Sequence, residues 1–295
     1  MINSFLNIKV GKKVILFVVL LLSLNQSLAT KIDDYFPVNI LPTASNYGNT
    51  GILELPNARF MKPAHLRLNF SSSFPNEYTS LTASPFDWLE ATYRYTEIKN
   101  EKYGPSSYSG NQSLKDKGFD VKARILKERI YRPAIAIGLR DIAGTGLLSS
   151  EYIVSSKSFN NFDLTLGIGW GILGTDNSLH NPFITFNKSF KQRNSIAGQG
   201  GSFSYKSWFS GQTSLFGGIE YKIPKYSTRI KLEYDTSNPD FRETVNSVKS
   251  RFNLGISYYL SDSLSISTSL ERGNQFRISF NLTGNFFEDS IPKPG

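Results

Sequence analysis

Apolar and polar residues alternate with a period of two along most of this chain. In residues 117–125, Phe119, Val121 and Ala123 take one phase while Lys122 and Arg124 take the other. This is the period of a β-strand, in which successive side chains point to opposite faces. A second alternating run at residues 134–140 follows a turn-like segment. Residues 117–140 are therefore predicted to form a β-hairpin.

The same alternation recurs almost without a break from residue 65 to residue 286, for example at 89–96, 163–170, 229–235, 251–258, 263–270 and 276–283. At roughly 16 to 18 residues per strand and connection, this length predicts about 12 to 14 strands. One face of every strand is apolar, and no segment of helical period could cover it. The fold class is predicted to be all-β, a transmembrane antiparallel β-barrel, and the alternative is a soluble β-sandwich.

Aromatic residues and connection lengths favour the barrel over the sandwich. Polar connections at 99–116, 173–181 and 236–249 alternate with tight ones at 127–132, 160–161, 224–226 and 261–262, as barrels with long loops on one side do. Residues 192–200 fit no short turn and leave the count open by about two strands. The residues expected in the interfacial aromatic girdles are Trp88, Trp170, Trp208, Tyr258, Tyr259, Phe286 and Phe287.

The N-terminal residues predict export from the cytoplasm. Lysines precede an apolar run at 14–24, which is shorter than the roughly 18 residues of a membrane-spanning helix and ends in a small-x-small site at Ala29. We expect a signal peptide at 1–29 cleaved near Ala29, a periplasmic lead-in or partial plug at 30–63, the barrel at 64–287 and a tail at 288–295. The expected location is the outer membrane of a Gram-negative bacterium.

Composition excludes several classes of site. The chain has no cysteine and two histidines, so disulfides, thiolate metal sites and a thiol nucleophile are excluded, and a zinc site is not expected. Charges of both signs are spread along the strands, which argues against nucleic-acid binding despite the net charge of +9. The glycines at 169, 171 and 174 match a dinucleotide motif by letter, but residues 175–177 do not begin a helix. No cofactor, metal or enzymatic activity is predicted.

The charged phase of the strands is predicted to line the lumen. Glu90 and Glu151 could be a glycosidase carboxylate pair, but we favour their pairing with the lumen cations. Such a charged lumen could gate transport electrostatically. The residues predicted to line the lumen and to contact polysaccharide are Glu90, Arg94, Lys122, Arg124, Arg140, Asp141, Glu151, Lys157, Lys231 and Glu233.

Ordered motifs along nearly the whole mature part of the chain resemble the YjbH family of exopolysaccharide biosynthesis proteins. The motifs are Gly51, PNARF (56–60), WLEATYRYT (88–96), DKGFDVK (116–122), GLRDIAGTG (138–146), SEY (150–152), SK (156–157), GIGWG (167–171), FGGIE (216–220), LEYD (232–235) and ERGN (271–274). The resemblance implies an outer-membrane barrel that acts in secretion or structural support of an extracellular polysaccharide. Many members are lipoproteins about twice as long, so this chain, which has no cysteine to acylate, is expected to correspond to their N-terminal barrel.

The function predicted from these observations is a non-enzymatic outer-membrane barrel whose charged lumen guides or gates a polysaccharide. Its expected partners are outer-membrane lipid, the extracellular polysaccharide and periplasmic export or assembly proteins. A general porin or a structural barrel is one alternative, and a secreted soluble β-sandwich that acts on glycans is another.

Overall fold

The computed structural model describes residues 42–143, 146, 148–193, 205–238 and 248–285. The predicted signal peptide at 1–29, the predicted tail at 288–295, Phe286 and Phe287 lie outside them. The described residues apart from Arg129–Tyr131 belong to one compact unit, which is the one considered below.

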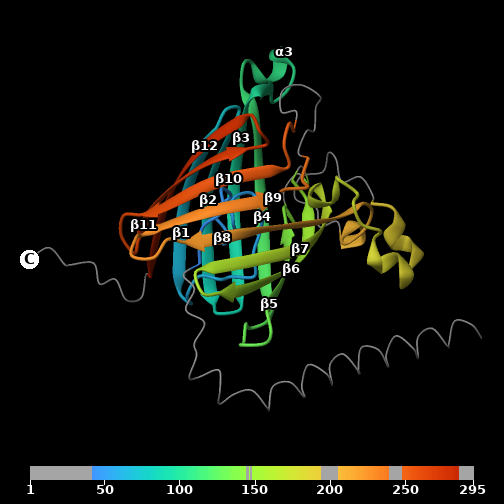
Figure 1. The fold of residues 1–295 in the computed structure, drawn as a ribbon. Helices are drawn as coiled ribbons and strands as arrows, with labels where there is room; N and C mark the ends of the chain where they lie inside the picture. The colour runs from blue at the N-terminus through green and yellow to red at the C-terminus, as the bar shows by residue number, and fades with distance from the viewer. Residues whose placement is uncertain (1–41, 144–145, 147, 194–204, 239–247, 286–295) are drawn as a thin grey trace, which may run out of the picture. The chain divides into compact units, whose positions relative to one another are not determined.

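Twelve antiparallel strands form one closed barrel, in which each strand pairs with its neighbours in the chain and β1 pairs with β12 (Figure 1). This confirms the predicted fold class, with a strand count at the lower end of the predicted range, and excludes a two-sheet sandwich. The strands are β1 His65–Ser73, β2 Asn76–Phe86, β3 Leu89–Lys102, β4 Ser113–Leu126, β5 Ala134–Arg140, β6 Ser150–Phe159, β7 Phe162–Gly171, β8 Thr213–Lys222, β9 Thr228–Tyr234, β10 Phe252–Tyr259, β11 Leu264–Glu271 and β12 Gln275–Asn285.

The helical segments of the described residues are all short. They are α3 Ser106–Ser109, η1 Ile172–Gly174, η2 Pro182–Thr185, η3 Lys188–Lys191 and η4 Tyr205–Ser207. None of the helices in this part of the chain has the length and apolar character needed to cross a membrane.

The burial pattern is inverted relative to a water-soluble protein. Along β10, Asn253, Gly255 and Ser257 are buried inside the barrel, whereas Leu254 and Ile256 are exposed on its outer face. The same arrangement holds along β3, β7, β9 and β12. A belt of exposed leucine, isoleucine and aromatic side chains therefore surrounds the barrel, as lipid contact requires.

The connections fall into two groups, as the sequence predicts. The β3–β4, β5–β6, β7–β8 and β9–β10 connections lie at one end of the barrel, and the turns after β2, β4, β6, β8 and β10 lie at the other. Residues 173–181 and 192–200 belong to the same β7–β8 connection, so no strand lies between them; residues 194–200 are outside the described part. The turn after β6 consists only of residues 160–161.

The girdle prediction holds for Trp88 and Tyr258 but is wrong for Trp170 and for Tyr259, which shares the inward phase of β10 with Ser257. Trp88 and Tyr258 are 48% and 52% exposed on the outside of the barrel. Trp170 is fully buried, because the β7–β8 connection folds over it and brings Phe183 and Phe209 against its ring at centroid distances of 5.4 and 5.1 Å.

Candidate functional site

Residues 43–61, which we call the plug, occupy the lumen of the barrel. Every residue of the plug except Ala44 is buried, and the chain there forms bends and two isolated bridges rather than regular structure. The plug contacts residues of all twelve strands. The wall residues that show this, in strand order, are Arg67, Tyr78, Glu90, Lys122, Arg140, Ser156, Asp163, Glu220, Glu233, Gly255, Glu271 and Ser279.

Wall carboxylates accept hydrogen bonds from the plug backbone. Glu233 on β9 accepts three consecutive amides, those of Leu53, Glu54 and Leu55, at 3.0, 2.9 and 3.2 Å. Glu90 on β3 accepts the amide and the hydroxyl of Thr50 at 2.7 and 2.6 Å. An irregular backbone buried away from water must find partners for its polar groups, and these carboxylates provide acceptors.

Wall cations donate to the carbonyl oxygens of the plug. Lys122 Nζ donates to the carbonyls of Thr50 and Arg59 at 2.9 and 2.7 Å. Lys231 Nζ donates to those of Ala44 and Ile52 at 2.9 and 2.6 Å. Both lysines are almost completely buried. The lumen charges are therefore complementary to the exposed amides and carbonyls of a chain without regular structure.

Cationic side chains also clamp the aromatic residues of the plug. The guanidinium groups of Arg94 and Arg140 each lie 4.9 Å from the centre of the Tyr47 ring. Lys122 and Arg124 each lie 4.6 Å from the centre of the Phe60 ring. Cation–π contacts are strongest when both groups are shielded from water, so these four wall cations hold both ends of the plug.

Two charged residues of the plug pair with the wall. Glu54 lies 3.7 Å from Arg277 Nε and 3.8 Å from Arg272 Nη2, and its carboxylate accepts the Tyr47 hydroxyl at 2.7 Å. Arg59 donates to Asp163 at 2.9 and 2.6 Å and pairs with Glu128.

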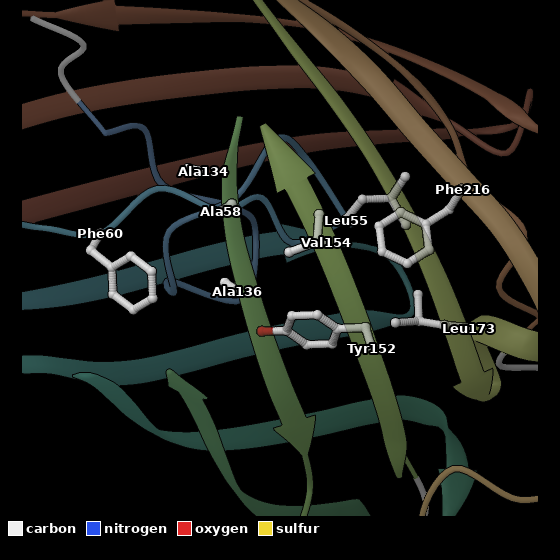
Figure 2. Close-up of a cluster of buried hydrophobic side chains, with 9 residues drawn as sticks. All are labelled: Leu55, Ala58, Phe60, Ala134, Ala136, Tyr152, Val154, Leu173 and Phe216. Atoms are coloured by element: carbon white, nitrogen blue, oxygen red, sulfur yellow. The ribbon is translucent and has the colours of Figure 1, made fainter. Parts of the chain in front are cut away.

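An apolar cluster completes the contact between the plug and one side of the lumen. Figure 2 shows the side chains of Leu55, Ala58 and Phe60 of the plug gathered with wall residues from β5, β6 and β8 and with Leu173 of η1. The wall members of the cluster are Ala134, Ala136, Tyr152, Val154 and Phe216. Hydrophobic burial therefore adds to the polar contacts in stabilising the plugged state.

Seven of the ten residues predicted to line the lumen point into it from their strands: Glu90, Arg94, Lys122, Arg124, Arg140, Lys231 and Glu233. All seven contact the plug through the hydrogen bonds or ring contacts described above. Asp141 follows β5 and is buried at the end of the barrel that carries the long connections, where its amide donates to Asp120 at 2.9 Å and its carboxylate accepts the Leu148 amide at 3.1 Å.

The lumen prediction is wrong for Glu151 and Lys157. Both lie on the outward phase of β6, opposite the outward residues Leu139 and Leu164 of the neighbouring strands. Glu151 is covered by the β7–β8 connection, where Arg193 donates to both of its oxygens at 2.6 and 2.9 Å. The inward phase of β6 carries Tyr152 and Val154 instead, because these side chains pack in the apolar cluster.

Several residues that hold the plug were not predicted from the sequence. They are Arg67, Ser156, Asp163, Glu220, Glu271, Arg277 and Ser279. Glu220, Glu271 and Ser156 lie in the motifs FGGIE, ERGN and SK, and the plug itself contains the motif PNARF. The sequence signal that could have predicted the contact between wall and plug is therefore that both carry motifs of the same family. Within the described residues no cluster of histidine, aspartate and glutamate is suited to a metal ion.

Comparison with protein families gives a match between residues 43–294 and the model described as "Exopolysaccharide biosynthesis protein YbjH" of the YjbH family. A relative described as "Uncharacterized lipoprotein YjbH", from Escherichia coli strain K12, is 40% identical over 254 residues that make up 85% of this chain. The chain belongs to the YjbH family. It spans 36% of the length of that YjbH relative. The YjbH family match begins at the first residue of the plug, so it includes both the plug and the barrel.

Solved structures that align with this YjbH family member have low sequence identity to it. A KdgM porin in complex with disordered oligogalacturonate aligns with a TM-score of 0.39 at 10% identity, over 75% of this chain and 99% of that one. A NanC porin aligns with a TM-score of 0.35 at 10% identity, over 74% and 97% of the two chains. Outer membrane phospholipase A from Escherichia coli aligns with a TM-score of 0.31 at 11% identity, over 76% and 96%.

Proposed function

We propose that this chain is a non-enzymatic outer-membrane barrel that acts in exopolysaccharide secretion, and that the plug gates its lumen. The observation that carries the proposal is the chemistry of the plug contact. The wall charges that could guide a polysaccharide are the same ones that bind the plug, so a polymer can use them only after the plug has moved. The plugged barrel is then the closed state of an export pore.

The outer membrane is the location that best fits the apolar belt. A closed antiparallel barrel with an even number of strands, an apolar outer face and long connections at one end is typical of outer-membrane proteins. Membership of an exopolysaccharide biosynthesis family supports a polysaccharide as the transported polymer. Periplasmic export or assembly proteins are the partners that would deliver it to the end of the barrel with the short turns.

A structural barrel is the second candidate, and the extent of the plug contact favours it. Lumen cations that donate to plug carbonyls and carboxylates that accept plug amides could equally make a permanent core. The occupied lumen argues against a general diffusion porin, because an open aqueous channel is what such a porin requires. The two candidates differ in whether the plug moves during secretion.

A reversible crosslink between plug and wall tests this difference. The Ala58 amide donates to Ser156 Oγ at 2.9 Å, so cysteines at these two positions lie side by side. The chain has no cysteine of its own, so A58C/S156C can form only this disulfide. If the plug gates export, oxidised cells will stop secreting the polysaccharide and will resume after addition of a reductant.

A matched control crosslinks two wall strands without the plug. Ser257 on β10 and Ser267 on β11 lie opposite each other with their hydroxyl oxygens 2.8 Å apart, so S257C/S267C gives a disulfide inside the lumen wall. This variant should secrete normally whether oxidised or reduced. Normal secretion by oxidised A58C/S156C, with the crosslink shown to be complete, would overturn the gate and support the structural barrel.

A further inference from the structure

The β7–β8 connection carries a cleft of about 740 Å³ that the lumen sites do not involve. Its sides come from η3, η4 and the residues next to them, drawn in yellow in Figure 1. The residues that line it are Lys188, Ser189, Phe190, Lys191, Gln192, Tyr205, Lys206, Trp208 and Ser210. It lies at the end of the barrel where the long connections are.

The cleft rests on a folded platform rather than on isolated loops. Asn181 Nδ2 donates to the carbonyls of Phe190, Phe209 and Gly211 at 3.1, 3.0 and 3.2 Å, which ties the two arms of the connection together. Arg193 binds Glu151 of β6 through both carboxylate oxygens. Bidentate arginine–carboxylate pairs fix orientation as well as distance. The cleft is therefore preorganised on the barrel wall.

An aromatic core lies beneath the cleft. Phe183 packs on Trp170, Phe190 and Phe209 with centroid distances of 5.4 to 5.6 Å. Trp170 of β7 is fully buried in this core, whereas Phe183, Phe190 and Phe209 of the connection are half-buried. The core leaves Tyr205, which is 65% exposed, on the side of the cleft with one face open to solvent.

The charge of the cleft has one sign. Lys188, Lys191 and Lys206 line it, and none of the three forms an ion pair with another of the described residues. No aspartate or glutamate occurs in the sequence between Asp176 and Glu220. A concave surface lined by charge of one sign raises the local concentration of ligands of the opposite sign.

We propose that this cleft binds an acidic polysaccharide, a deepening of the proposed function that names the substrate class. The lysines supply point charges for carboxylate groups, Gln192 and Ser189 supply hydrogen bonds for hydroxyl groups, and Tyr205 offers an open ring face for the C–H face of a sugar. A concave site with both aromatic and hydrogen-bonding groups fits a sugar chain better than it fits a flat lipid surface.

Binding of labelled alginate, a polymer of uronic acids, to the purified full chain in detergent tests the proposal, with dextran of equal length as the neutral probe. We expect alginate to bind and dextran not to bind. K188Q/K191Q/K206Q should weaken alginate binding about tenfold or more, since it removes the three positive charges that would pair with the carboxylates. Y205A should weaken it separately while leaving its dependence on salt concentration unchanged.

A matched control removes three exposed lysines at the other end of the barrel. K62Q/K222Q/K225Q makes the same change in net charge and should bind alginate within about twofold of the parent chain. Equal weakening by both triple variants would overturn the proposal, because binding would then be nonspecific.

Vesicles of phosphatidylglycerol and phosphatidylethanolamine provide the lipid test. If K188Q/K191Q/K206Q lost vesicle binding and kept alginate binding, the cleft would be a lipid site and the proposal would be wrong. This binding assay needs no movement of the plug. If the cleft binds alginate but the oxidised A58C/S156C variant still secretes, the cleft proposal is supported and the gate is rejected. If the cleft does not bind alginate but oxidised A58C/S156C stops secreting, only the cleft proposal is rejected.

Discussion

At the scale of single residues, Glu233 is the clearest example of a wall charge used to bind the plug. Its carboxylate is fully buried and accepts three plug amides together with the side-chain amide of Asn253 at 2.8 Å. Consecutive backbone amides that converge on one carboxylate form an anion site without any dedicated side chain from the plug.

Glu233→Ala should release this part of the plug, because it leaves three buried amides without an acceptor. We expect a loss of about 2 to 4 kcal/mol in the free energy of opening. Hydrogen exchange at the amides of Leu53, Glu54 and Leu55 measures it directly. The control is Glu77→Gln, which alters an exposed pair with Lys99 and should change the opening free energy by less than about 1 kcal/mol. Unchanged exchange in Glu233→Ala would show that the carboxylate does not hold the plug.

At the scale of elements, we predict that the stability of the turn that follows β5 depends on pH through the titration of Asp141. Burial, followed by the nearby charge of Asp116, raises the pKa of Asp141 to about 6, although Arg94 and the Leu148 amide oppose the shift. Asp120 adds to the acidic surroundings. The native turn therefore favours protonated Asp141. Its stability should rise as pH falls through about 6 and level off below about 4, the pKa of an exposed aspartate.

Asp141→Asn should remove most of this pH dependence, because asparagine is neutral throughout. Between pH 7 and pH 4 we expect the parent chain to gain about 1 to 3 kcal/mol relative to Asp141→Asn, measured as the protection of the Leu148 amide from exchange. Asp262 lies exposed in the turn after β10, so Asp262→Asn is a control that should keep the dependence of the parent chain. A variant Asp141→Asn with the parent's pH profile would contradict the assignment.

Strand β6 is where the sequence is a poor guide, and the reason is physical. In β3, β4 and β9 the inward phase is charged and the outward phase is apolar, so alternation alone predicts which side chains enter the lumen. In β6 the inward Tyr152 and Val154 are apolar because they pack on Leu55 and Ala58 of the plug. Glu151 faces outward because Arg193 neutralises it there. Both partners are distant in sequence, and the period of the strand carries no information about them.

The plug itself was only half predictable for a related reason. Its proline and glycine residues predict irregular structure, which indicated a periplasmic lead-in and left a partial plug as the other possibility. Whether this segment lies in the periplasm or in the lumen depends on its contacts with the twelve strands that follow it in the chain. Gly218 and Gly255 illustrate this, since a Cβ atom at either position would lie 2.7 and 2.6 Å from the side chains of Ile52 and Leu53. A wall glycine next to a plug side chain becomes meaningful only once the barrel has closed.

At the scale of the whole molecule, polarity is inverted: charges and hydroxyl groups make the interior, and apolar side chains make the outer surface. The free energy of the fold should therefore depend on the surrounding solvent. In a bilayer the belt is matched by lipid, and each strand pairs with both of its neighbours in the closed sheet, as a membrane-spanning β-structure requires.

Leu254→Arg tests this inversion, because Leu254 is 51% exposed on the outward phase of β10. If the belt contacts lipid, an arginine there should reduce the free energy of folding into bilayers by about 2 to 4 kcal/mol, measured by denaturant titration in vesicles. Leu254→Phe keeps the apolar character and should remain within about 1 kcal/mol of the parent chain. On a surface that faces water, arginine would be the better tolerated of the two. The order of the two variants in free energy of folding therefore decides whether lipid or water surrounds the barrel. A stable Leu254→Arg chain together with a destabilised Leu254→Phe chain would be compatible only with water.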